Sequence, residues 1–163
     1  MATTTICYFS GTGNSLAVAR AIAEALHGDL IPVTSTNQES ADVIGLVFPL
    51  YDFKPPQSIE GFVRKLEDID AKYLFAVCTY GIAPGKSLKH LDEIAKSRGG
   101  HLAGGFAVSM PHNGIGSARA PRAQREEKLA NWKVRVHEIC EYVQARGEGH
   151  VESNSPLSSL ARP

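Results

Sequence analysis

The 163-residue sequence has little that would draw it to nucleic acid or into a membrane. Its 17 lysine and arginine residues equal its 17 aspartate and glutamate residues in number, whereas proteins that bind nucleic acid normally carry a basic excess. No apolar run approaches the roughly 20 residues of a membrane span, and the N-terminus lacks the basic and then apolar pattern of a signal peptide. We therefore expect a cytoplasmic protein with no nucleic-acid partner and no membrane span.

Cysteine is also scarce. The three cysteines, Cys7, Cys78 and Cys140, are far apart in sequence, and their spacing matches neither a metal site nor an iron–sulfur site. Two of them lie in apolar strand patterns, which indicates buried thiols in a reducing compartment. The sequence therefore predicts no metal centre.

What the sequence does contain is a regular alternation of apolar strand patterns and helical stripes. This alternation predicts an α/β domain over residues 1–150, with a parallel sheet covered by helices on both faces and the last strand at an edge. Residues 151–163 are polar and rich in serine and proline, so we expect a linker-like tail, which is either a truncation point before another domain or the frayed end of this one. Strands are expected over residues 6–9, 29–33, 41–51, 72–81 and 101–111, and helices over 16–26, 56–67, 85–100 and 129–143.

The loop between the first strand and the first helix, "SGTGNS" at residues 10–15, contains neither lysine nor arginine. A Walker loop requires a lysine, so that type fails. A dinucleotide loop would place a third glycine at Leu16, which is too large for close helix–strand packing, and no acidic residue follows the second strand. A mononucleotide phosphate loop is therefore favoured over both a dinucleotide loop and a glycine turn with nothing bound.

Hydroxyls and backbone amides can replace cationic side chains around a phosphate. Two glycines allow the backbone to wrap closely, and the helix start adds about half a positive charge. Each hydrogen bond to a charged group contributes roughly 1.5–3 kcal/mol, so several suffice. Such a loop suits the phosphate of a cofactor that stays in place. The expected phosphate-binding residues are Ser10, Gly11, Thr12, Gly13, Asn14 and Ser15.

The stretch "YFSGTGNS" at residues 8–15 resembles the flavin mononucleotide (FMN) phosphate loop of flavodoxin-like proteins. The resemblance implies a doubly wound fold with a five-stranded parallel sheet of order 2-1-3-4-5, and FMN as the cofactor. Residues 47–63 and 79–88, followed by "VSMPHNGIG" at 108–116, are similar to one branch of that family. In this branch the flavodoxin-like module often precedes a ferredoxin segment with two [4Fe–4S] clusters.

In a doubly wound sheet, ligands bind beyond the carboxyl ends of the strands, at the switch point between strands 1 and 3. Tyr51 is therefore expected to stack on the flavin, with Phe53 second and Tyr80 from the opposite face, although these rings could instead cap the sheet. His112 could relay a proton or simply lie at the surface. The full set that the resemblance implies beyond the phosphate loop is Pro49, Leu50, Tyr51, Phe53, Thr79, Tyr80, Gly81, Gly85, His112 and Asn113.

The resemblance implies an FMN-binding electron-transfer domain that exchanges electrons with a ferredoxin-type iron–sulfur protein, a fused domain or another redox partner. An FMN-dependent NAD(P)H:quinone-type reductase is the alternative, and a non-redox module that keeps the fold is a third. No catalytic side chain is expected, because the redox chemistry belongs to the flavin. A basic segment would suit an acidic partner or be a solvated helix start; it contains Arg119, Arg122 and Arg125.

Overall fold

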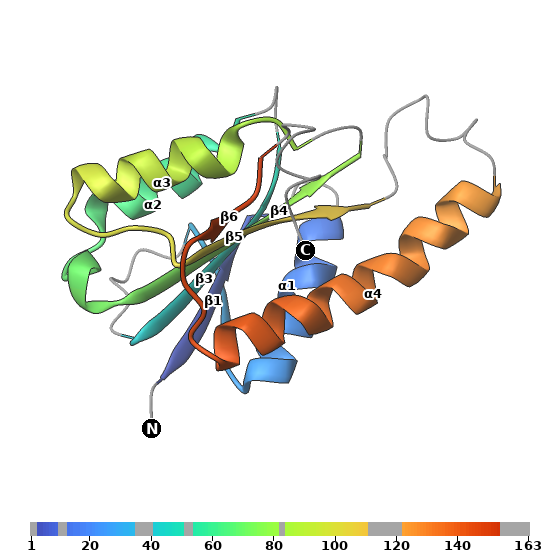
Figure 1. Ribbon diagram of the computed structural model, residues 1–163, viewed down its shortest axis with the longest axis horizontal. Coiled ribbons are helices and arrows are strands. Elements are labelled where there is room, and N and C mark those ends of the chain that lie inside the picture. Colours follow the sequence, from blue (N-terminus) through green and yellow to red (C-terminus); the bar gives the residue numbers. More distant parts are fainter. Residues whose placement is uncertain are drawn as a thin grey trace.

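A computed structural model describes residues 3–9, 13–34, 41–50, 54–81, 84–110 and 122–153, with side chains of the last range from residue 131 onward. Its elements alternate along the chain as the sequence predicts (Figure 1). They are β1 (Thr4–Tyr8), α1 (Asn14–Leu26), β2 (Asp29–Pro32), β3 (Val43–Pro49), α2 (Gln57–Lys65), the 3-10 helix η1 (Ile69–Ala71), β4 (Tyr73–Tyr80), α3 (Ser87–Ser97), β5 (Gly104–Ser109), α4 (Arg122–Gln144) and β6 (His150–Val151).

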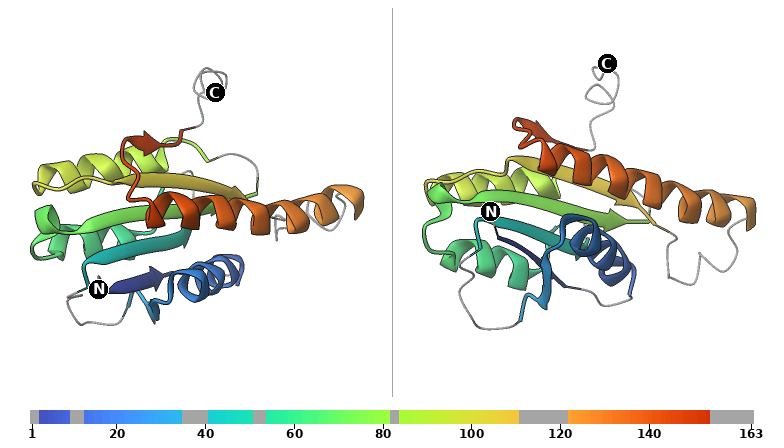
Figure 2. Two further views of the ribbon diagram at one scale, coloured as in Figure 1. Left: turned by 60° about the horizontal axis from the view of Figure 1, so that its bottom comes forward. Right: turned by 90° about the horizontal axis from the view of Figure 1, so that it is seen from below.

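The strands form one parallel sheet of order β2-β1-β3-β4-β5-β6, and the arrows of β1, β3, β4 and β5 point the same way in Figure 2. The doubly wound α/β class and the predicted order of the first five strands are confirmed. The strand count is six rather than five, so β5 is not an edge strand. The added strand, β6, is only two residues long, which is too short for a periodic pattern to reveal. Val151 and the buried Glu152, within the range predicted as a tail, lie at this edge.

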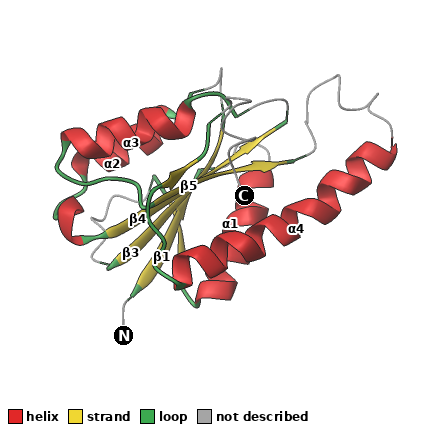
Figure 3. Ribbon diagram, in the orientation of Figure 1, coloured by secondary structure: helices red, strands yellow, loops and turns green. Residues whose placement is uncertain are grey.

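Helices cover both faces of the sheet, as Figure 3 shows, with α1 and α4 on one side and α2 and α3 on the other. Two apolar clusters result, one on each face. Val18 and Ile22 of α1 pack in the same cluster as Ile139 of α4. Ile59 of α2 and Leu91 of α3 pack in the other cluster. Because both faces are covered, the central strands are apolar along their whole length rather than alternating.

Gly45 shows how closely the centre of the sheet is packed. A Cβ atom at this position would lie 2.4 Å from Cζ of Phe75 and 2.9 Å from Cδ1 of Ile6. The Phe75 side chain is fully buried and occupies the space beside the glycine. The small residue in the otherwise bulky strand β3 is therefore explained by the aromatic ring of β4 beside it.

Candidate functional site

The carboxyl ends of the central strands meet at one edge, and hydrogen bonds fix the start of each loop there. The Phe9 N–H donates to the Val47 carbonyl at 2.9 Å, and the Leu50 N–H donates to the Thr79 carbonyl at 3.2 Å. The Met110 N–H likewise donates to the carbonyl that ends β4, at 2.9 Å. The loops after β1, β3, β4 and β5 therefore begin side by side, as a doubly wound sheet requires.

Helix α1 begins at this edge, directly after a glycine whose left-handed backbone conformation other residues rarely adopt. Gly13 has φ 93° and ψ −19°, in the left-handed region, and its carbonyl accepts the Ala17 N–H at 3.0 Å. No heavy atom lies within 4 Å of the Cβ position built on Gly13. The helix has no side-chain cap and no acidic residue in its first turn. Its positive end is thus left without a neutralising carboxylate from that turn, an arrangement that suits an anion.

A buried hydrogen bond joins the start of α1 to the end of β4. The Ser15 and Thr79 hydroxyl oxygens are 2.9 Å apart, and the two residues are 0% and 4% exposed. Each hydroxyl has one proton to donate, and one of the two protons is used in this contact. The pair therefore positions the N-terminal end of α1 against β4.

The remaining described residues of the predicted site lie around the same edge. Asn14, Pro49, Leu50 and Gly81 are partly buried. Gly85 has φ 61°, and it lies in the turn before α3, where the Ser87 hydroxyl donates to the Pro84 carbonyl at 3.2 Å. Seven predicted residues lie outside the described part of the chain and stay predictions: Ser10, Gly11, Thr12, Tyr51, Phe53, His112 and Asn113.

Tyr80 ends β4 and is partly buried. Burial raises the pKa of its hydroxyl, which a hydrogen bond from Ser109 partly offsets, so the side chain stays neutral around neutral pH. Tyr80 also lines a groove of about 370 Å³ between β5 and α4. The other lining residues are Ala107, Val108, Ser109, Asn131, Trp132, Val134, Arg135 and Glu138.

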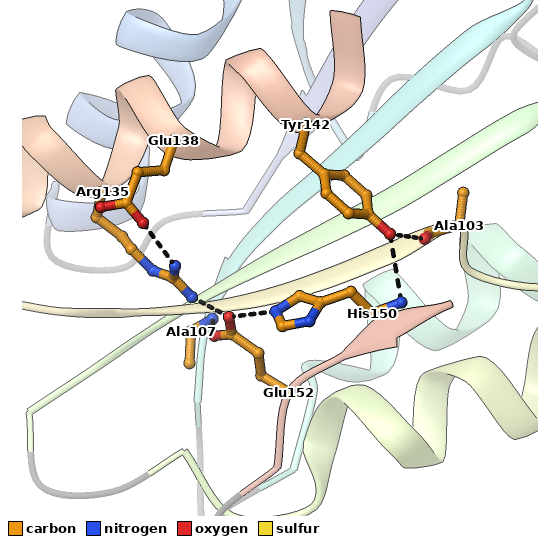
Figure 4. Close-up of polar contacts among 7 residues, drawn as sticks. All are labelled: Ala103, Ala107, Arg135, Glu138, Tyr142, His150 and Glu152. Carbon is orange, nitrogen blue, oxygen red and sulfur yellow. Dashed lines mark hydrogen bonds and ion pairs between the residues drawn. The ribbon is translucent and has the colours of Figure 1, made fainter. Parts of the chain in front are cut away.

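Beside this groove lies a polar cluster that the sequence did not reveal (Figure 4). The Glu152 carboxylate accepts the Ala107 N–H at 2.8 Å, is 2.8 Å from Nε2 of His150, and forms an ion pair with Arg135. Arg135 also contacts Glu138 at 3.2 Å. Burial alone would raise the pKa of the Glu152 carboxyl, but the hydrogen bonds from Arg135 and Ala107 outweigh it and lower that pKa. No spacing in the sequence marks this cluster, since its members come from α4, β5 and the segment after α4.

All three cysteines are buried, as the two in strand patterns were predicted to be. Burial raises the pKa of Cys78 to about 12 and that of Cys140 to about 11, so both remain thiols. Within the described residues, no group of three or more histidine, cysteine, aspartate or glutamate side chains could hold a metal ion. None of the helices described here has the length and apolar character needed to cross a membrane.

The fold matches that of solved flavodoxins. No protein-family model and no curated protein sequence matches the chain. A flavodoxin from the domain Archaea matches with TM-score 0.60 and 18% identity over 87% of this chain and 99% of its own. Two-electron reduced Megasphaera elsdenii flavodoxin matches with TM-score 0.56 and 23% identity over 71% and 93%. Rubredoxin oxygen:oxidoreductase from Desulfovibrio gigas gives TM-score 0.57 and 17% identity over 88% and 36%. The chain therefore has the flavodoxin-like fold.

Proposed function

We propose that this protein binds FMN at the carboxyl end of its sheet and carries electrons to or from an iron–sulfur partner, either a ferredoxin-type protein or a fused domain. The observation that carries the proposal is the start of α1 at the switch point between β1 and β3. There a left-handed Gly13 opens a helix with no acidic residue in its first turn. Directly before it stands a loop of hydroxyl and glycine residues.

The donors present suit a phosphate that undergoes no chemistry. The first-turn amides of α1 and the hydroxyls of Ser10 and Thr12 would hold the phosphate without any cation. The buried contact between Ser15 and Thr79 would keep that helix end in place against β4. An anchor of this type uses neutral donors and the helix dipole, each of which is effective where water is partly excluded.

The ring of the cofactor would lie over the loops that follow β3 and β4. Tyr80 stands at the end of β4 with a neutral hydroxyl, and Tyr51 follows β3 in sequence. An aromatic ring stacked on a planar heterocycle contributes roughly 1–3 kcal/mol. When bound, FMN would supply the redox chemistry; the chain would hold its phosphate, cover its ring and limit access of water.

The experiment that tests the cofactor is a titration of the purified protein with FMN and, in parallel, with riboflavin, which lacks the phosphate. We expect FMN to bind at least about 100-fold more tightly, because two or more charge-assisted hydrogen bonds of roughly 1.5–3 kcal/mol each are lost with riboflavin. Equal affinity for the two flavins would mean that the loop at residues 10–15 is no phosphate anchor. If neither flavin binds, the function is wrong.

A second measurement separates a carrier from a reductase. The FMN-saturated protein is mixed under anaerobic conditions with a reduced two-[4Fe–4S] ferredoxin or with NADPH, and the loss of flavin absorbance is timed. Faster reduction by the ferredoxin supports the carrier. Faster reduction by NADPH, followed by turnover with a quinone, would identify the protein as an NAD(P)H:quinone-type reductase instead.

A further inference from the structure

The outer edge of β5 is only partly covered by β6. The register of the two strands joins Gly104 to His150 and Gly105 to Val151. Beyond this point the Glu152 N–H donates to the Gly105 carbonyl at 3.0 Å, and the Glu152 side chain then accepts the Ala107 N–H. In the described part of the chain, no strand lies against β5 from Ala107 to Ser109 on this side.

Every second residue of this segment of β5 directs its backbone N–H and carbonyl toward the outer side of the sheet. Gly105 and Ala107 both bond to Glu152 on the outer side, whereas the Met110 N–H turns inward to the carbonyl of Tyr80. Because successive residues of a strand direct their amides and carbonyls to opposite sides, the Ala107 carbonyl and the Ser109 N–H also point outward. In a parallel pairing, the Ala107 carbonyl could accept the N–H of one residue of an added strand. The Ser109 N–H could then donate to the carbonyl of that same residue.

The groove described above lies along this edge and has one apolar wall. Trp132 is partly buried, and Val134 is the exposed large hydrophobic residue, at 61%, among those whose side chains the structure describes. The volume of about 370 Å³ is at the lower end of ligand sites. It would hold a short chain segment with one large side chain, and it is too small for a folded partner to enter.

The more exposed of the two charged residues that line the groove is a carboxylate. Arg135, 25% exposed, contacts both Glu138 and the buried Glu152, and His150 also contacts Glu152. The Glu138 side chain is 58% exposed at the rim. A basic side chain on the occupant would therefore be favoured over an acidic one.

We propose that the groove between β5 and α4 binds an extended peptide segment of a partner protein, which adds to the edge of β5 beside Ala107 and Ser109, packs an apolar side chain against Trp132 and places a lysine or arginine near Glu138. Addition of a strand to an exposed sheet edge is a common form of peptide recognition. Tyr80 lines this groove and is also one of the predicted cofactor residues, so the segment would dock one side chain away from the proposed cofactor. The inference stands independently of the proposed function.

The test uses the full-length protein and the capped tripeptide acetyl-Lys-Leu-Val-amide. Trp132 is the only tryptophan in the sequence, so its fluorescence reports the groove directly, and the backbone amide signal of Ser109 reports the strand edge. We expect saturable changes in both with a dissociation constant of about 1 mM, as is usual for so small a ligand. The same result is expected with and without FMN, so failure of the proposed function would not affect it.

Three comparisons make the test specific. The peptide with N-methylated leucine, which cannot donate to the Ala107 carbonyl, should bind roughly three- to tenfold more weakly. Acetyl-Glu-Leu-Val-amide should also bind more weakly than the lysine peptide. Asn131→Tyr, which adds a ring at an exposed lining position, should abolish binding, whereas Lys133→Ala, on the same helix but outside the groove, should leave it unchanged.

Several outcomes would overturn the proposal. Equal binding of the normal and N-methylated peptides would exclude strand addition. An absence of saturable change would exclude the site. Protection of the Ser109 amide from hydrogen exchange in the absence of peptide would mean that the groove is already filled. The occupant would be another copy if the protein sediments as a dimer, and the chain itself if it sediments as a monomer.

Discussion

The candidate cofactor edge and the β5–α4–β6 edge of the sheet are built in different ways. The cofactor edge depends on backbone conformation and small residues: the left-handed Gly13 and the Ser15–Thr79 contact between hydroxyls. The other edge depends on charged side chains from distant segments, with Arg135 and His150 both held by Glu152. The first should therefore be sensitive to backbone changes and the second to loss of charge.

The largest effect is expected from breaking the ion pair at the β6 edge. Arg135→Met leaves the Glu152 carboxylate, 5% exposed, without its arginine partner, with His150 still beside it. We expect the free energy of unfolding to fall by about 2–3 kcal/mol, somewhat less than for a fully buried pair because Arg135 is 25% exposed. Urea denaturation followed by circular dichroism measures this loss.

Arg64→Met is the matched control for that change. Arg64 pairs with Glu60 at 3.7 Å on the surface of α2, with 56% of its side chain exposed, and such pairs contribute at most about 1 kcal/mol. A loss in Arg135→Met no larger than in Arg64→Met would mean that the cluster at Glu152 does not hold β6. The affinity for FMN should be the same in both variants, because neither arginine lies among the cofactor-site residues.

A smaller effect is expected at the cofactor edge from Ser15→Ala. The substitution leaves the buried Thr79 hydroxyl without this partner, which costs about 1–2 kcal/mol of unfolding free energy. The double variant Ser15→Ala/Thr79→Val removes both polar groups and should recover part of the loss. Ser97→Ala, which removes an exposed hydroxyl bonded to the Ile94 carbonyl at 2.6 Å, should cost less than about 0.5 kcal/mol.

The two edges also differ in how well they could be predicted from the sequence. The strands themselves follow from long apolar runs such as Val43–Pro49, which need no knowledge of their neighbours. The start of α1 after Gly13 follows from local residues in the same way. The order of the strands in the sheet follows only from the resemblance of the loop at residues 8–15 to that of flavodoxin-like proteins. His150–Val151 has no pattern to detect, and Glu152 pairs with Arg135, a residue 17 positions earlier. The groove beside Trp132 exists only once α4 has packed on the sheet, so nothing local indicates it.

Gly13→Ala tests whether backbone conformation controls the start of α1. An alanine at φ 93° is strained, which costs about 1 kcal/mol of unfolding free energy. Gly61→Ala is the control, and its effect on stability should have the opposite sign. A Cβ atom meets no neighbour at either glycine, but Gly61 lies inside helix α2, where alanine is favoured over glycine. That substitution should stabilise the protein by about 0.5–1 kcal/mol. Thermal unfolding of the two variants should move in opposite directions, and a shift in the same direction would mean that Gly13 is not held in the left-handed region.

The smallest effect is a pH dependence at the β6 edge. The pKa of Glu152 is lowered in the folded state from its usual value of 4.5. Its carboxylate therefore stabilises the fold fully above about pH 4.5, and this contribution is lost as the pH falls through the lowered pKa. The difference in unfolding free energy between the wild-type protein and Glu152→Gln should shrink over that interval, as measured by urea titrations from neutral to acid pH. Glu141→Gln, at a position 65% exposed on α4, should differ little from wild type throughout. A Glu152→Gln difference that grew toward acid pH would mean that the carboxyl enters the fold protonated, since only a raised pKa gives that sign.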